Sequence, residues 1–206
     1  MQYDILVNKE NEIDMALYNN VILPSLIEVP FERDNKEVLI AQGNYSNKIY
    51  LETETKTKWL ELRNHVRDSK NVDFDICNGF LTIEQQQFKY DDFLNRNGIE
   101  LTEKRMALPG YSEHHTGLAI DCDYFYNGDW AGITPDEDGK ENDITLWIHN
   151  ELHNYGFILR YPKGKEDITN MSYEPWHIRY VGLELANYMS DNDLTLEEYN
   201  QLRKSK

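Results

Sequence analysis

Residues 116–124 read TGLAIDCDY, an apolar run that carries one carboxylate at Asp121 and another at Asp123. Side chains alternate between the two faces of a strand, so Ala119 and Asp121 share one face while Ile120 packs behind them. The run therefore predicts a largely buried strand that presents a carboxylate on one side.

Helical and extended patterns flank this strand on both sides. Apolar spacing and capping residues predict helices over residues 53–68, 83–97 and 143–155, and two short helices in the C-terminal tail. Further strands are expected at residues 72–77, in FILRY (157–161) and in EPWHIRYV (174–181). Because helices and strands do not alternate strictly, the order favours an α+β fold with a central, mainly antiparallel sheet and helices packed on it. We expect a single domain over residues 1–206, with residues 1–50 as an extended segment that wraps the core.

The composition is that of an acidic, globular chain. Its 206 residues have a formal net charge of −16 at pH 7, and 40% of them are hydrophobic. Nucleic acid and anionic membrane surfaces bind basic patches, so neither is expected as a partner. No run approaches the roughly 20 apolar residues that span a bilayer, so we expect no membrane segment. Cys77 and Cys122 lie in apolar segments and are expected to be buried and unpaired.

Two segments, SEHHTGLAID and EPWHIRY, hold the residues that suit chemistry. His114, Asp121 and His177 supply two imidazoles and a carboxylate, which suits a catalytic zinc site with one position left for water. Glu174 lies three residues before His177, where a carboxylate can take a proton from that water and pass it on. The spacing alone leaves a second interpretation open, in which these are ordinary hydrogen-bonded residues at strand ends.

Both segments resemble those of a known enzyme family. S-x-H-x-x-G-x-A-x-D over residues 112–121, followed by E-P-W-H-x-R-Y over residues 174–180, resembles the VanY-like D-alanyl-D-alanine carboxypeptidases. The resemblance extends from about residue 51 to residue 199. It implies a small α+β fold with a metal ion on an antiparallel sheet.

The same resemblance implies a role for each matching residue. His114, Asp121 and His177 would bind Zn²⁺, and Glu174 would be the catalytic base. The implied reaction is hydrolysis of the C-terminal D-Ala-D-Ala bond of a peptidoglycan stem peptide or precursor, with the free dipeptide as a further substrate.

The chain departs from the family pattern in one segment. The family shows G-Y-R-S-x-x-x-Q where residues 79–86 read GFLTIEQQ, so Leu81 stands in place of the arginine. A leucine cannot supply the paired hydrogen bonds of a guanidinium. Either another cation takes over that role or the substrate preference differs, and the candidate cations are Arg105, Arg160 and Arg179. The side chains that we expect to contact substrate are Ser112, Gln86 and Arg179.

The loss of the arginine keeps other functions open. One alternative is an L,D-carboxypeptidase or an endopeptidase that acts on cell-wall peptides. Another is a non-catalytic peptidoglycan-binding relative, although a decayed enzyme tends to lose its ligands and base. We expect a cytoplasmic location, as in VanXY-like relatives without an anchor; the alternative is an extracellular, membrane-anchored form whose anchor is missing here.

The remaining histidines are not expected to bind metal. His149 and His153 lie four residues apart on a predicted helix, but Asn150 stands where helical zinc peptidases need a glutamate. We expect both to lie on the helix surface. His115 is expected to point away from the metal.

Overall fold

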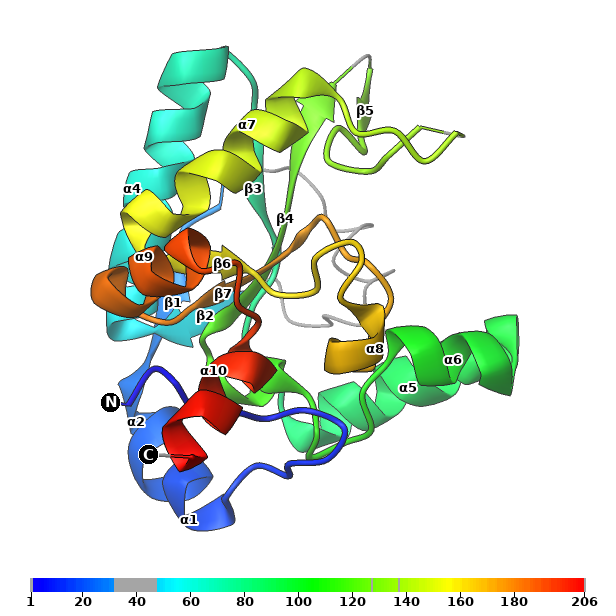
Figure 1. The fold of residues 1–206 in the computed structure, drawn as a ribbon. Helices are drawn as coiled ribbons and strands as arrows, with labels where there is room; N and C mark the ends of the chain where they lie inside the picture. The colour runs from blue at the N-terminus through cyan, green and yellow to red at the C-terminus, as the bar shows by residue number, and fades with distance from the viewer. Residues whose placement is uncertain (1, 32–47, 127, 137, 206) are drawn as a thin grey trace.

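The protein is described here by a computed structural model that covers residues 2–31, 48–126, 128–136 and 138–205. A five-stranded antiparallel sheet lies at its centre, in the order β3-β4-β7-β6 with β5 paired to β4 (Figure 1). Its strands are β3 (Phe74–Asn78), β4 (Ala119–Tyr126), β5 (Asp129–Trp130), β6 (Phe157–Leu159) and β7 (His177–Tyr180). A separate antiparallel pair consists of β1 (Leu26–Val29) and β2 (Ile49–Glu52). The predicted α+β fold in a single domain with a mainly antiparallel sheet is confirmed.

Helices surround the sheet, and those predicted over residues 53–68, 83–97 and 143–155 are present with bounds that agree to within two residues, the last as two consecutive helical segments. The larger helices are α4 (Thr53–Lys70), α5 (Ile83–Asn97), α6 (Ile99–Arg105), α7 (Asp143–Glu151), α9 (Leu183–Asp191) and α10 (Leu196–Lys204). The short ones are α1 (Met15–Leu17), η1 (Tyr18–Ile22), α2 (Leu23–Ser25), η2 (Glu113–Thr116), η3 (Leu152–Tyr155) and α8 (Glu166–Thr169). None of the helices in the described part of the chain is long and apolar enough to cross a membrane.

The boundaries of α5 illustrate how local sequence sets the elements. Thr82 accepts a hydrogen bond from the backbone of Gln85, whose side chain accepts one from Thr82 N, so the predicted capping box forms. Gly98 ends the helix with a φ of +79°, which favours glycine. The chain continues directly into α6, a helix that the sequence did not predict.

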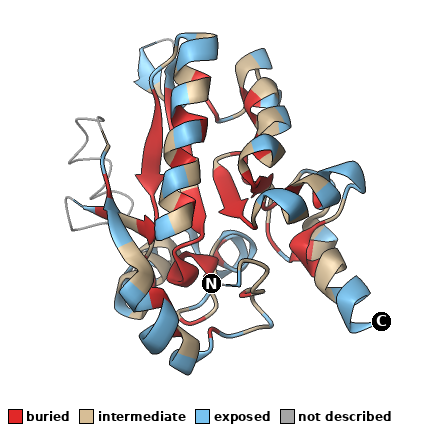
Figure 2. Ribbon diagram, turned by 90° about the vertical axis from the view of Figure 1, so that its left-hand side faces the viewer, coloured by how far each residue is buried: buried red, intermediate tan, exposed pale blue. Residues whose placement is uncertain are grey.

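The hydrophobic core lies on one face of the sheet. Trp59 and Leu62 of α4 pack there with Ile148 of α7 against Ile120 of β4 and Ile178 of β7. All five are fully buried, and Figure 2 shows buried strands behind helices whose outer faces are exposed. The alternation predicted for the central strand is confirmed, because Ile120 enters this core while Asp121 faces the opposite side. That opposite face is where the candidate site is built.

The N-terminal segment is only partly extended, so the prediction for residues 1–50 is wrong for Met15–Ser25. These residues form three consecutive short helical segments. Asp14 caps the first one by accepting hydrogen bonds from the backbone N–H groups of Ala16 and Leu17. Pro24 does not interrupt the turns, because a proline fits in the first turn of a helix. Residues 32–47 of the same segment lie outside the described residues.

Candidate metal centre

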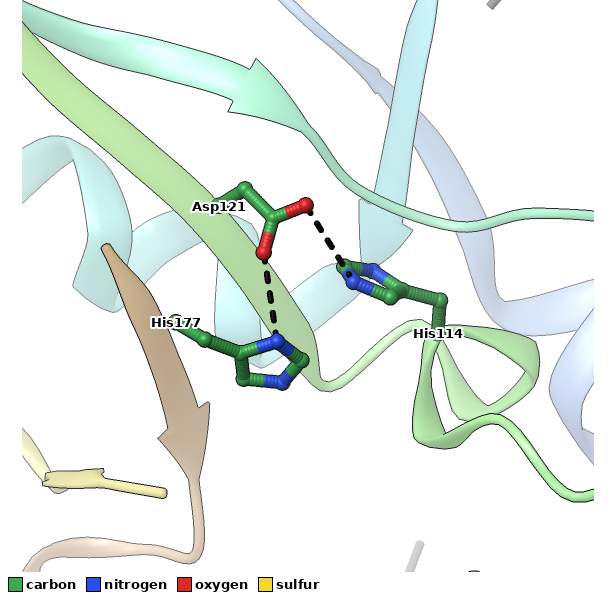
Figure 3. Close-up of side chains that lie close together, drawn as sticks. All are labelled: His114, Asp121 and His177. Atoms are coloured by element: carbon green, nitrogen blue, oxygen red, sulfur yellow. Dashed lines mark ion pairs between the residues drawn. The ribbon is translucent and has the colours of Figure 1, made fainter. Parts of the chain in front are cut away.

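Three elements bring the predicted ligands together. His114 comes from the short turn η2, Asp121 from β4 and His177 from β7 (Figure 3). Asp121 and His177 are direct partners in the β4–β7 ladder, which places their side chains side by side. The turn that carries His114 ends at Gly117, where φ is +70°. A Cβ at Gly117 would lie 2.8 Å from the Leu26 side chain, so only glycine lets the chain pass directly into β4.

The ligand atoms have the spacing that a metal ion needs. His114 Nε2 lies 3.4 Å from Asp121 Oδ2, and His177 Nδ1 lies 3.2 Å from Asp121 Oδ1. One ligand atom from each residue can be chosen so that all three lie within 4.8 Å of one another. Zn–N and Zn–O bonds of about 2.0–2.2 Å put two ligands of a tetrahedral site roughly 3.3–3.6 Å apart. The three side chains therefore fit a zinc ion.

The hydrogen bonding of the Asp121 carboxylate is also typical of a metal ligand. Its Oδ2 accepts a hydrogen bond from the Asn78 side-chain amide at 3.1 Å. Its Oδ1 is buried and faces His177 Nδ1 at 3.2 Å, but no described residue donates a well-formed hydrogen bond to it. A buried carboxylate oxygen without a donor is costly, and a cation removes that cost.

The two imidazoles are oriented by contacts on their far sides. His114 Nδ1 lies 2.8 Å from the carbonyl of Gly79 and donates to it, which leaves Nε2 free to bind metal. His177 Nε2 lies 3.0 Å from Glu113 Oε1, and donation there leaves Nδ1 free. In metal sites such contacts fix the tautomer of a histidine and raise its basicity.

Glu113 belongs to a buried network of charges that the sequence did not reveal. Its Oε2 accepts hydrogen bonds from Arg160 at 2.7 Å and from Arg179 at 3.1 Å. Arg160 also donates two hydrogen bonds to Glu197. Burial alone would raise the pKa of Glu113, but the two guanidinium groups hold it well below its usual range. Glu113 therefore faces His177 as a fixed carboxylate.

The pKa values of the ligands themselves reflect their mutual contacts. Burial acts to raise the pKa of Asp121, yet His114 and His177 lower it well below the usual value. Burial likewise acts to lower the pKa of His177, but the nearby carboxylates of Asp121, Glu113 and Glu174 raise it well above the usual value. The pocket thus favours a positive charge beside these carboxylates.

Glu174 lies next to the three ligands. Its Oε2 is 3.4 Å from His177 Nδ1, and the side chain is buried at the cavity wall. The backbone on either side is fixed, because Glu174 N donates to Tyr161 O at 3.2 Å and His149 Nε2 lies 2.9 Å from Pro175 O. The prediction of His149 as a helix-surface residue is therefore wrong. Its ring is mostly buried and holds the segment that carries Glu174.

A cavity of about 360 Å³ opens beside the ligands. Gln86 and Ser112, both expected to contact substrate, lie in its wall. Gln86 donates to the carbonyl of Ala107 at 2.7 Å, which fixes its amide. Three cations also line it, namely Lys89, Arg96 and Arg105.

Arg179 and Leu81 lie outside the cavity wall. Arg179 is fully buried behind His177, where it donates to Glu113 and to the backbone carbonyls of Tyr3 and Ile5. The structure thus does not bring Arg179 together with Gln86 and Ser112. Arg160 also lies outside the cavity wall, where it donates hydrogen bonds to Glu113 and Glu197. Leu81 is fully buried, and its carbonyl lies 2.8 Å from Nδ1 of His115, which points away from the metal ligands as expected.

Comparison with known proteins adds an independent line of support. The family model described as VanY, D-alanyl-D-alanine carboxypeptidase, matches residues 48–183. VanXYC of Enterococcus gallinarum, a bifunctional D-Ala-D-Ala dipeptidase and carboxypeptidase, is 35% identical over 95% of this chain and 92% of its own length. YodJ of Bacillus subtilis is 44% identical over 59% of this chain, which spans only 43% of that relative.

Solved structures agree with the sequence matches. The vancomycin-resistance D,D-dipeptidase VanXYg, solved with a D-Ala-D-Ala phosphinate analogue, superposes with a TM-score of 0.75 at 31% identity, over 96% of this chain and 70% of its own. The L,D-carboxypeptidase LdcB superposes with a TM-score of 0.72 at 32% identity, over 95% and 84%. A D,D-pentapeptidase VanY from a VanB-type resistance cassette, solved with Zn(II), superposes with a TM-score of 0.69 at 29% identity, over 97% and 99%.

Proposed function

The chain belongs to the VanY family of D-alanyl-D-alanine carboxypeptidases, and from that premise we propose that it is a zinc peptidase that removes the terminal D-alanine from cell-wall peptides. The proposed substrate is a peptidoglycan stem peptide or precursor that ends in D-Ala-D-Ala. One observation carries the proposal: His114, Asp121 and His177 meet in a cavity wall with Glu174 beside them.

The residues of the chain fit Zn²⁺, which a VanY relative binds. When bound, Zn²⁺ supplies a Lewis acid that polarises a carbonyl and makes hydroxide available near neutral pH. His114 Nε2, Asp121 Oδ1 and His177 Nδ1 would hold it, because these atoms are the ones left free by the hydrogen bonds on their far sides.

Glu174 is the proposed proton carrier. Its Oε2 would accept a proton from the attacking water and then give it to the amine of the departing D-alanine. The position of Oε2, buried at the cavity wall and 3.4 Å from a ligand nitrogen, supports this role.

A D-alanine release assay tests the proposal. Zinc-loaded protein should release D-alanine from a pentapeptide that ends in D-Ala-D-Ala, and Glu174→Gln should lose at least about 100-fold in kcat while keeping its zinc. The matched control is Glu100→Gln, an exposed carboxylate on α6 that does not line the cavity. Undiminished turnover by Glu174→Gln would remove Glu174 from the mechanism, and no release by the wild type would remove the activity.

Two finer questions concern the substrate. The near full-length match to a bifunctional relative supports cleavage of the free dipeptide as well as of the pentapeptide. The likeness to LdcB supports a second candidate, L,D-carboxypeptidase activity on a tetrapeptide. Mass spectrometry of digests of the pentapeptide, the tetrapeptide and the dipeptide separates these activities by the residue that each one releases.

The compartment is part of the proposal too. We place the protein in the cytoplasm, supported by two buried cysteines, Cys77 and Cys122, that form no disulfide, which suits a reducing interior. Fractionation of the native host with an antibody against the chain tests this placement. Recovery in the membrane or culture medium would contradict it.

A further inference from the structure

We propose that Lys89 binds the terminal carboxylate of the substrate and so makes the enzyme specific for chain ends. This inference rests on the proposed function and adds a specificity residue to it. The starting point is a chemical requirement. A peptidase that removes one residue from a chain end must recognise the carboxylate there, and burying a carboxylate requires a cation or strong hydrogen bonds.

The cavity offers three lysine or arginine side chains for that role among the residues that the structure describes. They differ in what already surrounds them. Arg96 is ion-paired with Asp92 one turn earlier on α5, and 60% of its side chain is exposed. Arg105 lies at the end of α6 and is exposed. Both would keep most of their water when a peptide binds, so neither gives a strong contact.

Lys89 has a different environment. It is half-buried in the cavity wall, and no described residue forms a hydrogen bond or an ion pair with its ammonium group. Burial lowers the pKa of Lys89, while the carboxylates of Asp121 and Glu174 act to raise it. Asp121 and Glu174 line the same cavity as Lys89. A partly desolvated cation without a partner is suited to an incoming anion.

The helix places Lys89 in the wall of the cavity that holds the metal ligands. Lys89 follows Gln86 by three residues on α5, so the two side chains lie on the same face, and both line the cavity. The terminal carboxylate of a substrate lies one residue, at most about 3.6 Å along the chain, beyond the bond that is cut. A flexible four-carbon side chain on the cavity wall spans such a short offset. Lys89 would hold the end of the peptide while Glu174 acts on the bond before it.

The test compares a peptide ending in D-Ala-D-Ala with the same peptide ending in a C-terminal amide. We expect the wild type to prefer the free acid, and Lys89→Met to raise KM for the acid by about 10- to 100-fold with little change in kcat, because the lost contact is a charge-assisted hydrogen bond. The acid-over-amide preference should fall by the same factor. Lys89→Arg should restore most of it.

Calorimetry gives a readout that does not depend on turnover. In the zinc-loaded Glu174→Gln background, Lys89→Met should weaken binding of the acid but not of the amide. Lys104→Met is the matched control, since Lys104 is exposed on α6 and does not line the cavity. Lys89→Gln serves in its place if Lys89→Met does not fold.

The outcomes separate the two proposals. An unchanged acid-over-amide preference in an active Lys89→Met enzyme would overturn the role of Lys89 and leave the peptidase intact. Loss of that preference in Arg105→Met instead would assign the role to Arg105. If the wild type cleaves neither peptide, the proposed function itself fails.

Discussion

Replacing Glu113 by glutamine should weaken zinc binding although Glu113 is not a ligand. Glu113 Oε1 accepts the hydrogen bond from His177 Nε2, while its Oε2 pairs with Arg160 and Arg179. An amide is isosteric but neutral, so His177 loses its anionic partner and becomes a weaker base. Removing such a contact behind a metal ligand typically lowers metal affinity about 10- to 100-fold, or roughly 1.4–2.7 kcal/mol.

The same substitution leaves two buried guanidinium groups with less negative charge around them. Breaking a buried ion pair on one side typically costs about 3–5 kcal/mol. At roughly 2–4 °C per kcal/mol for a chain of this size, the melting temperature of the metal-free protein should fall by about 6–20 °C. Zinc affinity is measured by competition with a chelator, and stability by thermal unfolding without metal.

Glu197→Gln is the matched control for this experiment. Glu197 accepts hydrogen bonds from Arg160 in the same buried network. Its link to the metal ligands is indirect, because it runs through Arg160 and then Glu113. The substitution should lower the melting temperature while leaving zinc affinity within about threefold of the wild type. Equal zinc affinities for wild type and Glu113→Gln would refute the idea that Glu113 strengthens His177 as a ligand.

Arg160 and Arg179 hold the pKa of Glu113 below its usual range, so the stability that this carboxylate contributes is present above about pH 4.3 and is lost as the pH falls further. In acid unfolding of the metal-free protein, Glu113→Gln should therefore lose less stability than the wild type between about pH 5 and 3. Gly117→Ala puts a Cβ 2.8 Å from the Leu26 side chain at a φ of +70°, and should cost about 1–3 kcal/mol in denaturant unfolding and more than Gly128→Ala, whose Cβ meets nothing within 4 Å. His149→Leu removes the hydrogen bond to Pro175 O and should lower kcat/KM about 10-fold with zinc content unchanged; a wild-type kcat/KM would show that this contact does not position Glu174.

Local periodicity predicted which way Asp121 points, but not the complete set of metal ligands. The alternation around Asp121 placed Ile120 in the core and the carboxylate on the other face, and the register of β4 with β7 then sets Asp121 beside His177. Pairing of the two strands depends on the whole fold. The choice of partner for Asp121 therefore came from the resemblance to a family and not from the spacing of residues.

The contacts behind the ligands could not be predicted in the same way. Glu113 meets His177 across 64 residues of sequence, and the tertiary fold brings them together. Arg179 was expected at the substrate as a cation that could replace the family arginine missing at Leu81, but it is buried behind His177 and donates to Glu113. The position of Lys89 could have been predicted from the sequence, because it lies three residues after Gln86 on a predicted helix. Helical spacing puts both side chains on one face.

The metal content of Asp121→Asn tests the central claim most directly. Asp121 is the one ligand that lies close to both others, and asparagine keeps its shape and its contact with Asn78 but removes the charge. After dialysis against a weak chelator, the wild type should retain about one zinc ion per chain and Asp121→Asn should retain almost none, with both variants folded. Retention of one zinc per chain by Asp121→Asn would contradict the assignment of His114, Asp121 and His177 as the metal centre.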